Sequence, residues 1–260
     1  MHYYAELLFA IFAIFNSTQC HSWVEDLSVI NIEGDLTGSP GYSRGYVQRT
    51  LIFDDQAIPN PLFSDDTMTY LLPPNGRPGN DFLPTDLICM SSQDSRNETV
   101  SSPILRASPG SRVVVRYQEN GHVTLQTPIG KPPKAGKTFI YGTNESSPSD
   151  TLHKIHNVWT RDGTGGNGRG TLLSEQTFDD GRCYADNGSF KAERRKAVAG
   201  YPSDPIQGAN LWCRNEILLP ARLNPGSIYT VYWVWDWPTV ADGKNGKKEL
   251  YTTCIDIEIV

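Results

Sequence analysis

Glycine and proline divide this chain into short segments, and their spacing restricts the fold more than any other feature. The chain has 23 glycines and 18 prolines in 260 residues. Proline lacks a backbone donor and has a fixed φ, so it is excluded from helix interiors and central strands. Between residues 54 and 86 we expect loops, without long helices or central strands, because of six prolines: Pro59, Pro61, Pro73, Pro74, Pro78 and Pro84.

The segments between these breaks carry β-branched and aromatic residues in the pattern of strands. Asn120-Gly121 predicts a tight turn, and residues 122–125 are expected to continue as a strand beyond it. Residues 33–45 are expected to form turns, and no long helical periodicity is visible. The pattern predicts an all-β sandwich with long decorated loops. The predicted strands cover residues 27–32, 110–117, 137–141, 215–220, 228–237 and 249–260, with Trp233, Trp235 and Trp237 on one face.

The start of the chain has the pattern of a secretory signal peptide. Residues 7–15 read LLFAIFAIF, an apolar run too short to span a bilayer. Small residues at Thr18 and Cys20 permit cleavage directly before His21. No later apolar segment reaches membrane length, which favours a cleaved signal over an anchor. We therefore expect residues 1–20 to be removed and residues 21–260 to form one secreted, extracellular domain.

The cysteines agree with secretion. Of the five, Cys20 would leave with the signal peptide, and the remaining four predict two disulfides. Three connectivities are possible, and we favour Cys183–Cys213 together with Cys89–Cys254. Three Asn-X-Ser/Thr glycosylation sequons point the same way: Asn97, Asn144 and Asn187.

Charge and motif content exclude several classes of function. The net charge of −6 argues against a nucleic-acid binder, and the short basic run over residues 191–196 is interpreted as solvated surface. Residues 163–168 match G-x-G-x-x-G by count, but no strand-to-helix unit surrounds them, so a dinucleotide site is not expected. Acidic pairs at residues 54–55, 65–66 and 179–180 suit turns, and nothing joins them into a glycosidase site.

An N-terminal histidine offers a metal two nitrogens from one residue, its α-amine and its ring. Cleavage before His21 would create such a residue, and Cu(II) prefers nitrogen ligands of this kind. A second ligand must then come from the remaining histidines. We favour His122, which follows a confident strand, and keep His153 and His156 as alternatives. For an isolated histidine, a surface or hydrogen-bonded role would be favoured; a terminal histidine makes a second metal ligand more expected.

The last predicted strand supplies two further candidates. Glu249 and Tyr251 are two residues apart, so their side chains leave the strand on the same face. A tyrosine could cover the axial side of a copper ion, and a carboxylate beside it could relay protons or hydrogen-bond an oxygen species. By spacing alone, an ordinary sheet aromatic and a surface charge are the favoured explanation of the pair.

With these residues in view, the chain resembles the lytic polysaccharide monooxygenases of fungi, as a divergent relative. The resemblance rests on His21, on the strand leading to His122, and on residues 232–254. The last block is most similar to the W-x-W…R-E-M-Y-M-N-C pattern of the chitin-active group. The resemblance implies an immunoglobulin- or fibronectin-like sandwich holding one copper ion, bound by His21 and His122 with Tyr251 axial. It also implies Glu249 as the second-sphere catalytic carboxylate beside Tyr251.

Three functions follow as hypotheses. The first is a secreted copper-dependent monooxygenase or peroxygenase that cleaves glycosidic bonds at C1 or C4 of a polysaccharide such as chitin, cellulose or another cell-wall glycan. It would need an external electron donor, and we expect a monomer with neither nucleic-acid nor membrane partners. The alternatives are a copper-binding homeostasis protein and a metal-free carbohydrate-binding sandwich. Aromatics such as Trp23 or Tyr42, if exposed, could stack on sugar rings, but core packing is the more expected fate of any one aromatic.

Overall fold

The computed structural model describes residues 21–53, 56–79, 81–99, 101–125, 134–202, 206–238 and 248–260. The predicted signal peptide over residues 1–20 lies outside this part of the chain. Within the described ranges, none of the helices combines the length and apolar character that a transmembrane span requires.

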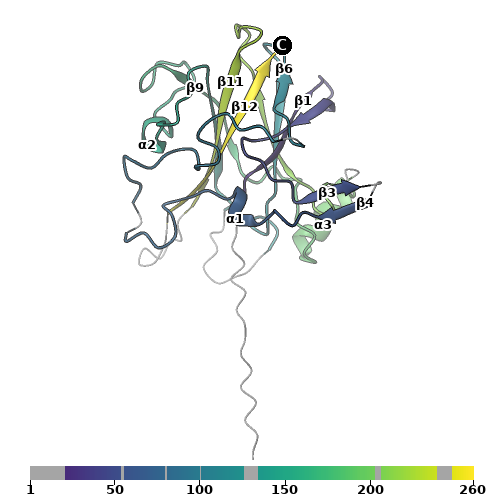
Figure 1. Cartoon of the computed structure of the whole chain (residues 1–260). Helices are drawn as coiled ribbons and strands as arrows, with labels where there is room; N and C mark the ends of the chain where they lie inside the picture. Colours follow the sequence, from purple (N-terminus) through teal and green to yellow (C-terminus); the bar gives the residue numbers. More distant parts are fainter. Residues whose placement is uncertain are drawn as a thin grey trace, which may run out of the picture.

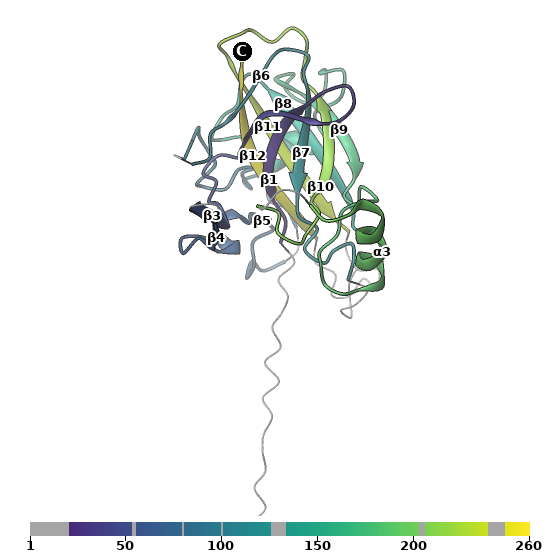
Figure 2. The ribbon, with the colours of Figure 1, turned by 90° about the vertical axis from the view of Figure 1, so that its right-hand side faces the viewer.

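Two packed β-sheets form the body of the molecule, as the side views show (Figures 1 and 2). Among the described residues, sheet A has four strands in the order β10-β7-β1-β2, and sheet B has β5-β12-β11-β8-β9 with β6 beside β12. Pairing is antiparallel except between β6 and β12, which confirms the all-β sandwich. Sheet A contains β1 (Val24–Ile30), β2 (Leu36–Gly41), β7 (Arg112–Tyr117) and β10 (Cys213–Leu218). Sheet B contains β5 (Leu71–Leu72), β6 (Leu105–Ala107), β8 (Lys137–Thr143), β9 (Gly170–Thr177), β11 (Ile228–Trp237) and β12 (Glu249–Ile259).

The remaining elements lie outside the two sheets. A small hairpin of β3 (Thr50–Phe53) and β4 (Gln56–Pro59) projects from the body (Figure 1). Short helices occupy the connections: α1 (Asp65–Met68), α2 (Leu152–Ile155) and α3 (Phe190–Ala199).

Strand β11 separates two hydrophobic clusters because its side chains alternate between the faces of sheet B. Trp233 and Trp235 point into the core between the sheets, with Trp237 at the end of the same row. Tyr232 and Val234 point to the opposite face, where loops cover them. We call these the inner and outer faces of sheet B. Both are apolar, so β11 is buried on both sides along most of its length.

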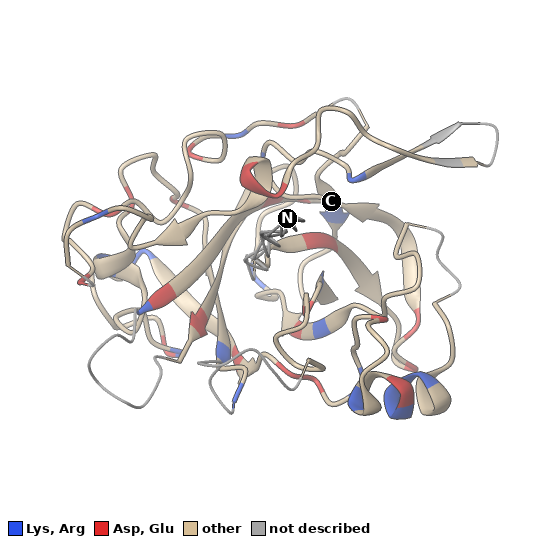
Figure 3. Cartoon of the chain, turned by 90° about the horizontal axis from the view of Figure 1, so that it is seen from below, with Lys and Arg blue, Asp and Glu red and all other residues tan. Residues whose placement is uncertain are grey.

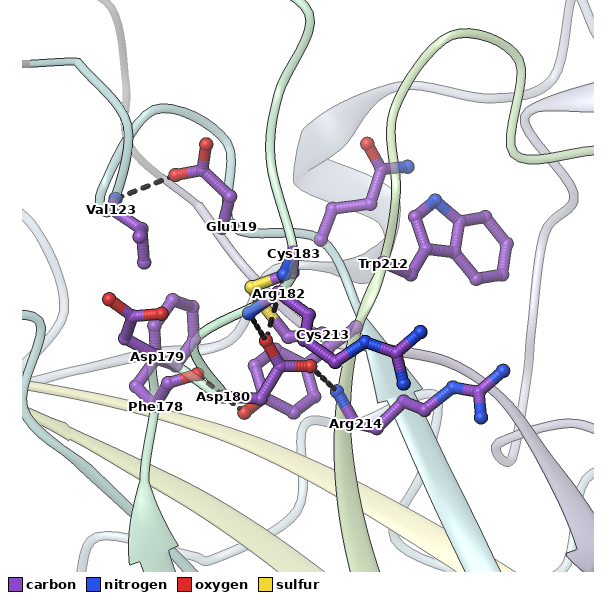
Figure 4. Close-up of a disulfide and its surroundings, with 12 residues drawn as sticks. Glu119, Val123, Phe178, Asp179, Asp180, Arg182, Cys183, Trp212, Cys213 and Arg214 are labelled. Atoms are coloured by element: carbon purple, nitrogen blue, oxygen red, sulfur yellow. Dashed lines mark hydrogen bonds between the residues drawn. A yellow bond between two sulfur atoms is a disulfide. The ribbon is translucent and has the colours of Figure 1, made fainter. Parts of the chain in front are cut away.

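Both favoured disulfides are present. Cys89 is bonded to Cys254 in β12, and Cys183 to Cys213 at the start of β10. Figure 4 shows the second bond beside Asp180, whose carboxylate accepts hydrogen bonds from the backbone N–H groups of Cys183 and Arg214. This carboxylate and the disulfide together fix the loop before β10 to the sheet.

Three local predictions were wrong, each for a physical reason. The segment expected to form turns after β1 contains β2, which pairs with β1 at the sheet edge, where its proline is tolerated. Residues 122–125 form turns instead of a strand, because the Glu119 side chain binds their backbone N–H groups. Helix α3 begins after Ser189, whose hydroxyl caps Ala192 N–H. It was missed because Ala192 is its one buried residue, so it has no apolar stripe.

Candidate metal centre

His21 is placed by the pairing of β1 with β7. The two strands are antiparallel with Val24 opposite Tyr117, so the residues before β1 lie beside those after β7. Ser22 Oγ donates to the Gln118 carbonyl over 2.8 Å, and Asn120 Nδ2 donates to the carbonyl of His21 over 2.5 Å. The register of sheet A therefore brings His21 next to the turn that carries His122.

Aromatic rings connect the predicted ligands. The ring of His122 lies 4.6 Å from Trp235 and 4.2 Å from Trp237, measured between centroids. Trp235 lies 5.0 Å from Tyr251, which in turn lies 6.3 Å from His21. Four segments that are distant in sequence thus meet at the end of the inner face of sheet B.

His21 has an unusual hydrogen-bonding environment. Its side chain is buried, with 5% of the residue exposed, and its Nδ1 has no hydrogen-bond partner within the part of the chain that the structure describes. Buried polar atoms are normally paired, because desolvation without a partner costs about 1–3 kcal/mol. A metal ion would satisfy this nitrogen. The donor set, two imidazoles and a phenol, also suits copper.

The predicted pair on β12 is in place. Tyr251 and Glu249 stand opposite Trp235 and Trp237 in the β11–β12 ladder. The Tyr251 hydroxyl donates to Glu249 Oε2 over 2.8 Å, so both side chains lie on one face, as their spacing predicted. The tyrosine is buried while the carboxylate is partly exposed, so Glu249 connects the buried site with solvent.

Sequence reasoning missed Glu119, which holds the turn that carries His122. Its carboxylate is 1% exposed and accepts from Val123 N at 2.6 Å, from Ala185 N at 2.7 Å and from the hydroxyl of Thr124. Figure 4 shows it reaching Val123 near the Cys183–Cys213 disulfide. The Asn120-Gly121 dipeptide predicted the turn, but nothing local in the sequence identifies Glu119 as the residue whose carboxylate binds the backbone N–H groups of the turn.

His153 and His156 belong to a different place. His153 is exposed on α2, while His156 follows this helix and packs on Phe139 with ring centroids 4.8 Å apart. His156 Nε2 lies 4.0 Å from Asp236, and Asp236 points away from its neighbours Trp235 and Trp237, which contact His122. His156 is therefore on the outer face of sheet B, and the structure does not bring it together with His21.

Comparison with known families covers nearly the whole chain. The model of a domain of unknown function, DUF7492, matches residues 18–260. The chain belongs to the DUF7492 family. No curated protein matches it.

Solved structures with a similar architecture exist, and fifteen chains match this DUF7492 protein. CvAA9A has 13% sequence identity and a TM-score of 0.40, over 92% of this chain and 78% of its own. Cel61B from Hypocrea jecorina, a glycoside hydrolase family 61 member, has 14% identity and a TM-score of 0.26, over 60% of this chain and 51% of its own. Likenesses this distant give no information about activity.

For two aromatic residues of this DUF7492 chain, packing in the core, the more expected of two fates, is confirmed. Trp23 is 1% exposed and lies under the guanidinium of Arg49, 4.2 Å from its carbon to the ring centroid. Tyr42 is 8% exposed and packs on Tyr46. Neither ring is available to stack on a sugar, because both belong to a small hydrophobic cluster near the start of β1.

The DUF7492 surface carries charges of both signs, as the view from below shows (Figure 3). Helix α3 contains the basic run predicted as solvated surface, and three of its four cations form ion pairs with nearby carboxylates. Lys191 and Arg195 contact Asp179, and Lys196 contacts Asp186. Pairing of this kind reduces the excess positive charge on the helix.

Within the described ranges, one group of three His, Cys, Asp or Glu side chains lies close enough together to share a metal ion. It consists of Asp180, Cys183 and Cys213. Because the two sulfur atoms are bonded to each other, neither is a thiolate ligand. This cluster is therefore structural, and the candidate metal centre is the one around His21.

Proposed function

We propose that this chain is a secreted, copper-dependent polysaccharide monooxygenase or peroxygenase. The observation that carries the proposal is the meeting of His21, His122 and Tyr251 at one end of the sandwich, with a buried ring nitrogen of His21 that lacks a described partner. The sequence resemblance to fungal lytic polysaccharide monooxygenases suggested the class, while the geometry of these side chains supplies the support.

In this proposal His21 and His122 hold one copper ion. After signal cleavage His21 would contribute its α-amine and its ring, and His122 would contribute its ring. Copper bound there would supply the redox chemistry by which an external electron donor and oxygen or hydrogen peroxide oxidise a sugar C–H bond at C1 or C4. Trp235 and Trp237 pack against His122 and keep water from the core side of its ring.

Tyr251 and Glu249 have separate tasks. Tyr251 is buried between Trp235 and His21 and would cover one side of a metal held there. Glu249 accepts the tyrosine proton in a hydrogen bond and is partly exposed, so its second oxygen can hold or release a proton at the edge of the site.

The rest of the protein fits an extracellular setting. Both disulfides need an oxidising compartment to form and persist. The three sequon asparagines, Asn97, Asn144 and Asn187, are exposed and accessible for glycosylation. We propose that residues 1–20 are the signal peptide and that residues 21–260 act as a single, monomeric domain on a cell-wall polysaccharide.

Product analysis tests the proposal. The secreted protein with His21 as its confirmed N-terminus is loaded with copper and incubated with ascorbate and hydrogen peroxide on chitin, cellulose and other cell-wall glycans. We expect oxidised oligosaccharides from at least one of them, and none from the His21→Ala variant. A copper-loaded protein with an intact N-terminus that releases no oxidised sugar from any of them would contradict the enzyme function.

One observation favours a second candidate, a copper-binding protein without oxidase activity. The hydrogen bond between Tyr251 and Glu249 engages the two proposed catalytic groups with each other. A homeostasis protein needs His21 and His122 but not this pair. If the Glu249→Gln variant binds copper as the unaltered protein does, and neither form oxidises sugar, this candidate is supported.

A further inference from the structure

A separate cleft of about 580 Å³ opens beside the outer face of sheet B. Its size is in the range of small-ligand pockets. Apolar rings line part of it, namely Phe82 and Trp237, while His156 and Asp236 provide polar groups. Trp237 also contacts His122, so the cleft and the candidate metal centre share a wall.

The hydrogen bonds around His156 fix its tautomer. The hydroxyl of buried Tyr141 accepts the backbone N–H of Asn157 over 3.0 Å and lies 3.1 Å from His156 Nδ1. The tyrosine proton needs an acceptor, and Nδ1 provides one only when it carries no proton itself. The network therefore assigns the ring proton to Nε2. Burial lowers the pKa of His156 to about 4, so the ring is neutral near neutral pH.

The Nε2–H group and the Asp236 carboxylate face each other across a gap. Nε2 lies 4.0 Å from Asp236 Oδ2, too far for a direct hydrogen bond. One hydroxyl group placed between them would accept from Nε2–H and donate to the carboxylate, each over an ordinary distance. Alcohol hydroxyls have both functions, whereas a carbonyl or a phosphate oxygen only accepts. The gap thus selects a hydroxyl-bearing ligand.

The charges of the described residues around the cleft are largely balanced. Two lysines line it, Lys137 and Lys248, but each is balanced by a carboxylate outside the lining. Lys137 Nζ lies 2.6 Å from Glu175, and Lys248 Nζ lies 3.9 Å from Asp81. Asp236 adds a further negative charge within the cleft. The electrostatics therefore favour a neutral ligand.

We propose that this cleft is a binding subsite for a neutral sugar residue. The apolar face of the sugar ring would pack on Phe82 and Trp237, and one hydroxyl would bridge His156 Nε2 and Asp236. This subsite goes beyond the proposed copper chemistry, because none of these contacts needs a metal. A sugar held here would lie next to Trp237 and so bring a polysaccharide chain beside the candidate metal centre.

Calorimetric titration of the metal-free, secreted protein tests the subsite. The probes are chitohexaose, cellohexaose and laminarihexaose, with galacturonic acid hexamer as the acidic comparison. We expect saturable binding of at least one neutral hexamer, weakened about tenfold or more by Phe82→Ala and by Asp236→Ala. Lys154→Ala is the matched control, since this exposed residue of α2 does not line the cleft, and it should leave the affinity unchanged.

The outcomes separate this inference from the copper proposal. His21→Ala should keep the sugar affinity even though it removes oxidation, so either proposal can fail alone. The subsite is refuted if no neutral hexamer binds, if folded Phe82→Ala and Asp236→Ala proteins bind as the unaltered protein does, or if the acidic hexamer binds as tightly as the neutral ones. Thermal unfolding of each variant confirms that it is folded.

Discussion

The two faces of sheet B carry two different kinds of histidine site. On the inner face His21 and His122 meet tryptophans and a tyrosine that come from distant segments. On the outer face His156 comes from a single local turn and contacts Tyr141 and Asp236. Adjacent residues of β11 serve both, since Trp235 and Trp237 point inward while Asp236 points outward.

Hydrogen bonds around the rings distinguish the sites more clearly than histidine spacing does. His156 Nδ1 is paired with a tyrosine hydroxyl, which leaves Nε2 as a donor towards a cleft. His21 Nδ1 is buried with no partner among the described side chains and backbone groups. The first arrangement suits recognition of a hydroxyl, and the second suits a metal. Four predictions test this contrast.

The largest effect is expected from removing the aromatic wall of the inner face. Trp235 is fully buried, stacks on Phe178 with centroids 4.0 Å apart, and donates its N–H to the carbonyl of Ala135. Trp235→Ala should lower the free energy of unfolding by about 3–5 kcal/mol in urea denaturation. Val234→Ala, the neighbouring buried position of the outer face, should cost about half as much. Equal losses in the free energy of unfolding would show that Trp235 contributes no more to stability than Val234.

Acid should affect the outer face through His156. Its pKa is about 4 in the folded protein and near 6.5 when unfolded, so stability is full above pH 6.5 and falls as the unfolded chain takes up the proton. The loss is complete near pH 4 and amounts to about 3 kcal/mol. His156→Gln should lack this loss in urea titrations at pH 7, 5.5 and 4. A parallel pH dependence in both proteins would disprove the assignment.

Copper affinity should depend on the histidines at the inner face of sheet B and not on His156 at the outer face. His122→Ala should weaken copper binding about 100-fold or more, equivalent to about 2.7 kcal/mol, because a direct ligand is lost. His156→Ala should change it less than threefold. Competition titration of the secreted proteins, with copper EPR spectra, measures both. Copper loss on changing His156 instead of His122 would reverse the assignment of the two faces.

The smallest effects are expected from the two tyrosine hydroxyls. Tyr251→Phe removes a bond to a partly exposed carboxylate that water can replace, so it should cost about 1 kcal/mol or less. Tyr141→Phe leaves His156 Nδ1 and Asn157 N–H without this partner and should cost about 1–3 kcal/mol. Only Tyr251→Phe should alter the copper EPR spectrum. Thermal unfolding of both variants measures the two stability losses, and their EPR spectra show which tyrosine affects bound copper.

Much of the fold was predictable because strand patterns and cysteines are local signals. Strand β11 was found from its alternating aromatics, and Cys183–Cys213 and Cys89–Cys254 were the favoured disulfides. Strand β2 and helix α3 were missed because neither has a strong apolar pattern. No periodicity shows which single aromatics are exposed; core packing was the general expectation for Trp23 and Tyr42, and both are buried.

The candidate site also contains features that could be predicted from the sequence and features that could not. The spacing of Glu249 and Tyr251 sufficed to place them on one face, and a hydrogen bond now joins them. Glu119 was invisible, because its partners Val123 and Ala185 come together only through the tertiary fold. The gap between His156 and Asp236 likewise depends on the packing of α2 on the outer face, which sequence spacing does not encode.

The ladder between β1 and β7 has a practical consequence for making this protein. Val24 pairs with Tyr117 through the β1–β7 ladder, and this pairing does not depend on which residue precedes His21. Folding is therefore expected to be insensitive to the exact N-terminus. A recombinant form that keeps one extra residue or a tag before His21 should fold, form both disulfides and melt normally. It would nevertheless present an amide where the proposed chemistry needs an amine. A well-behaved preparation is therefore no guarantee of a competent one, and an exact leader cleavage must be verified before any inactive result is interpreted.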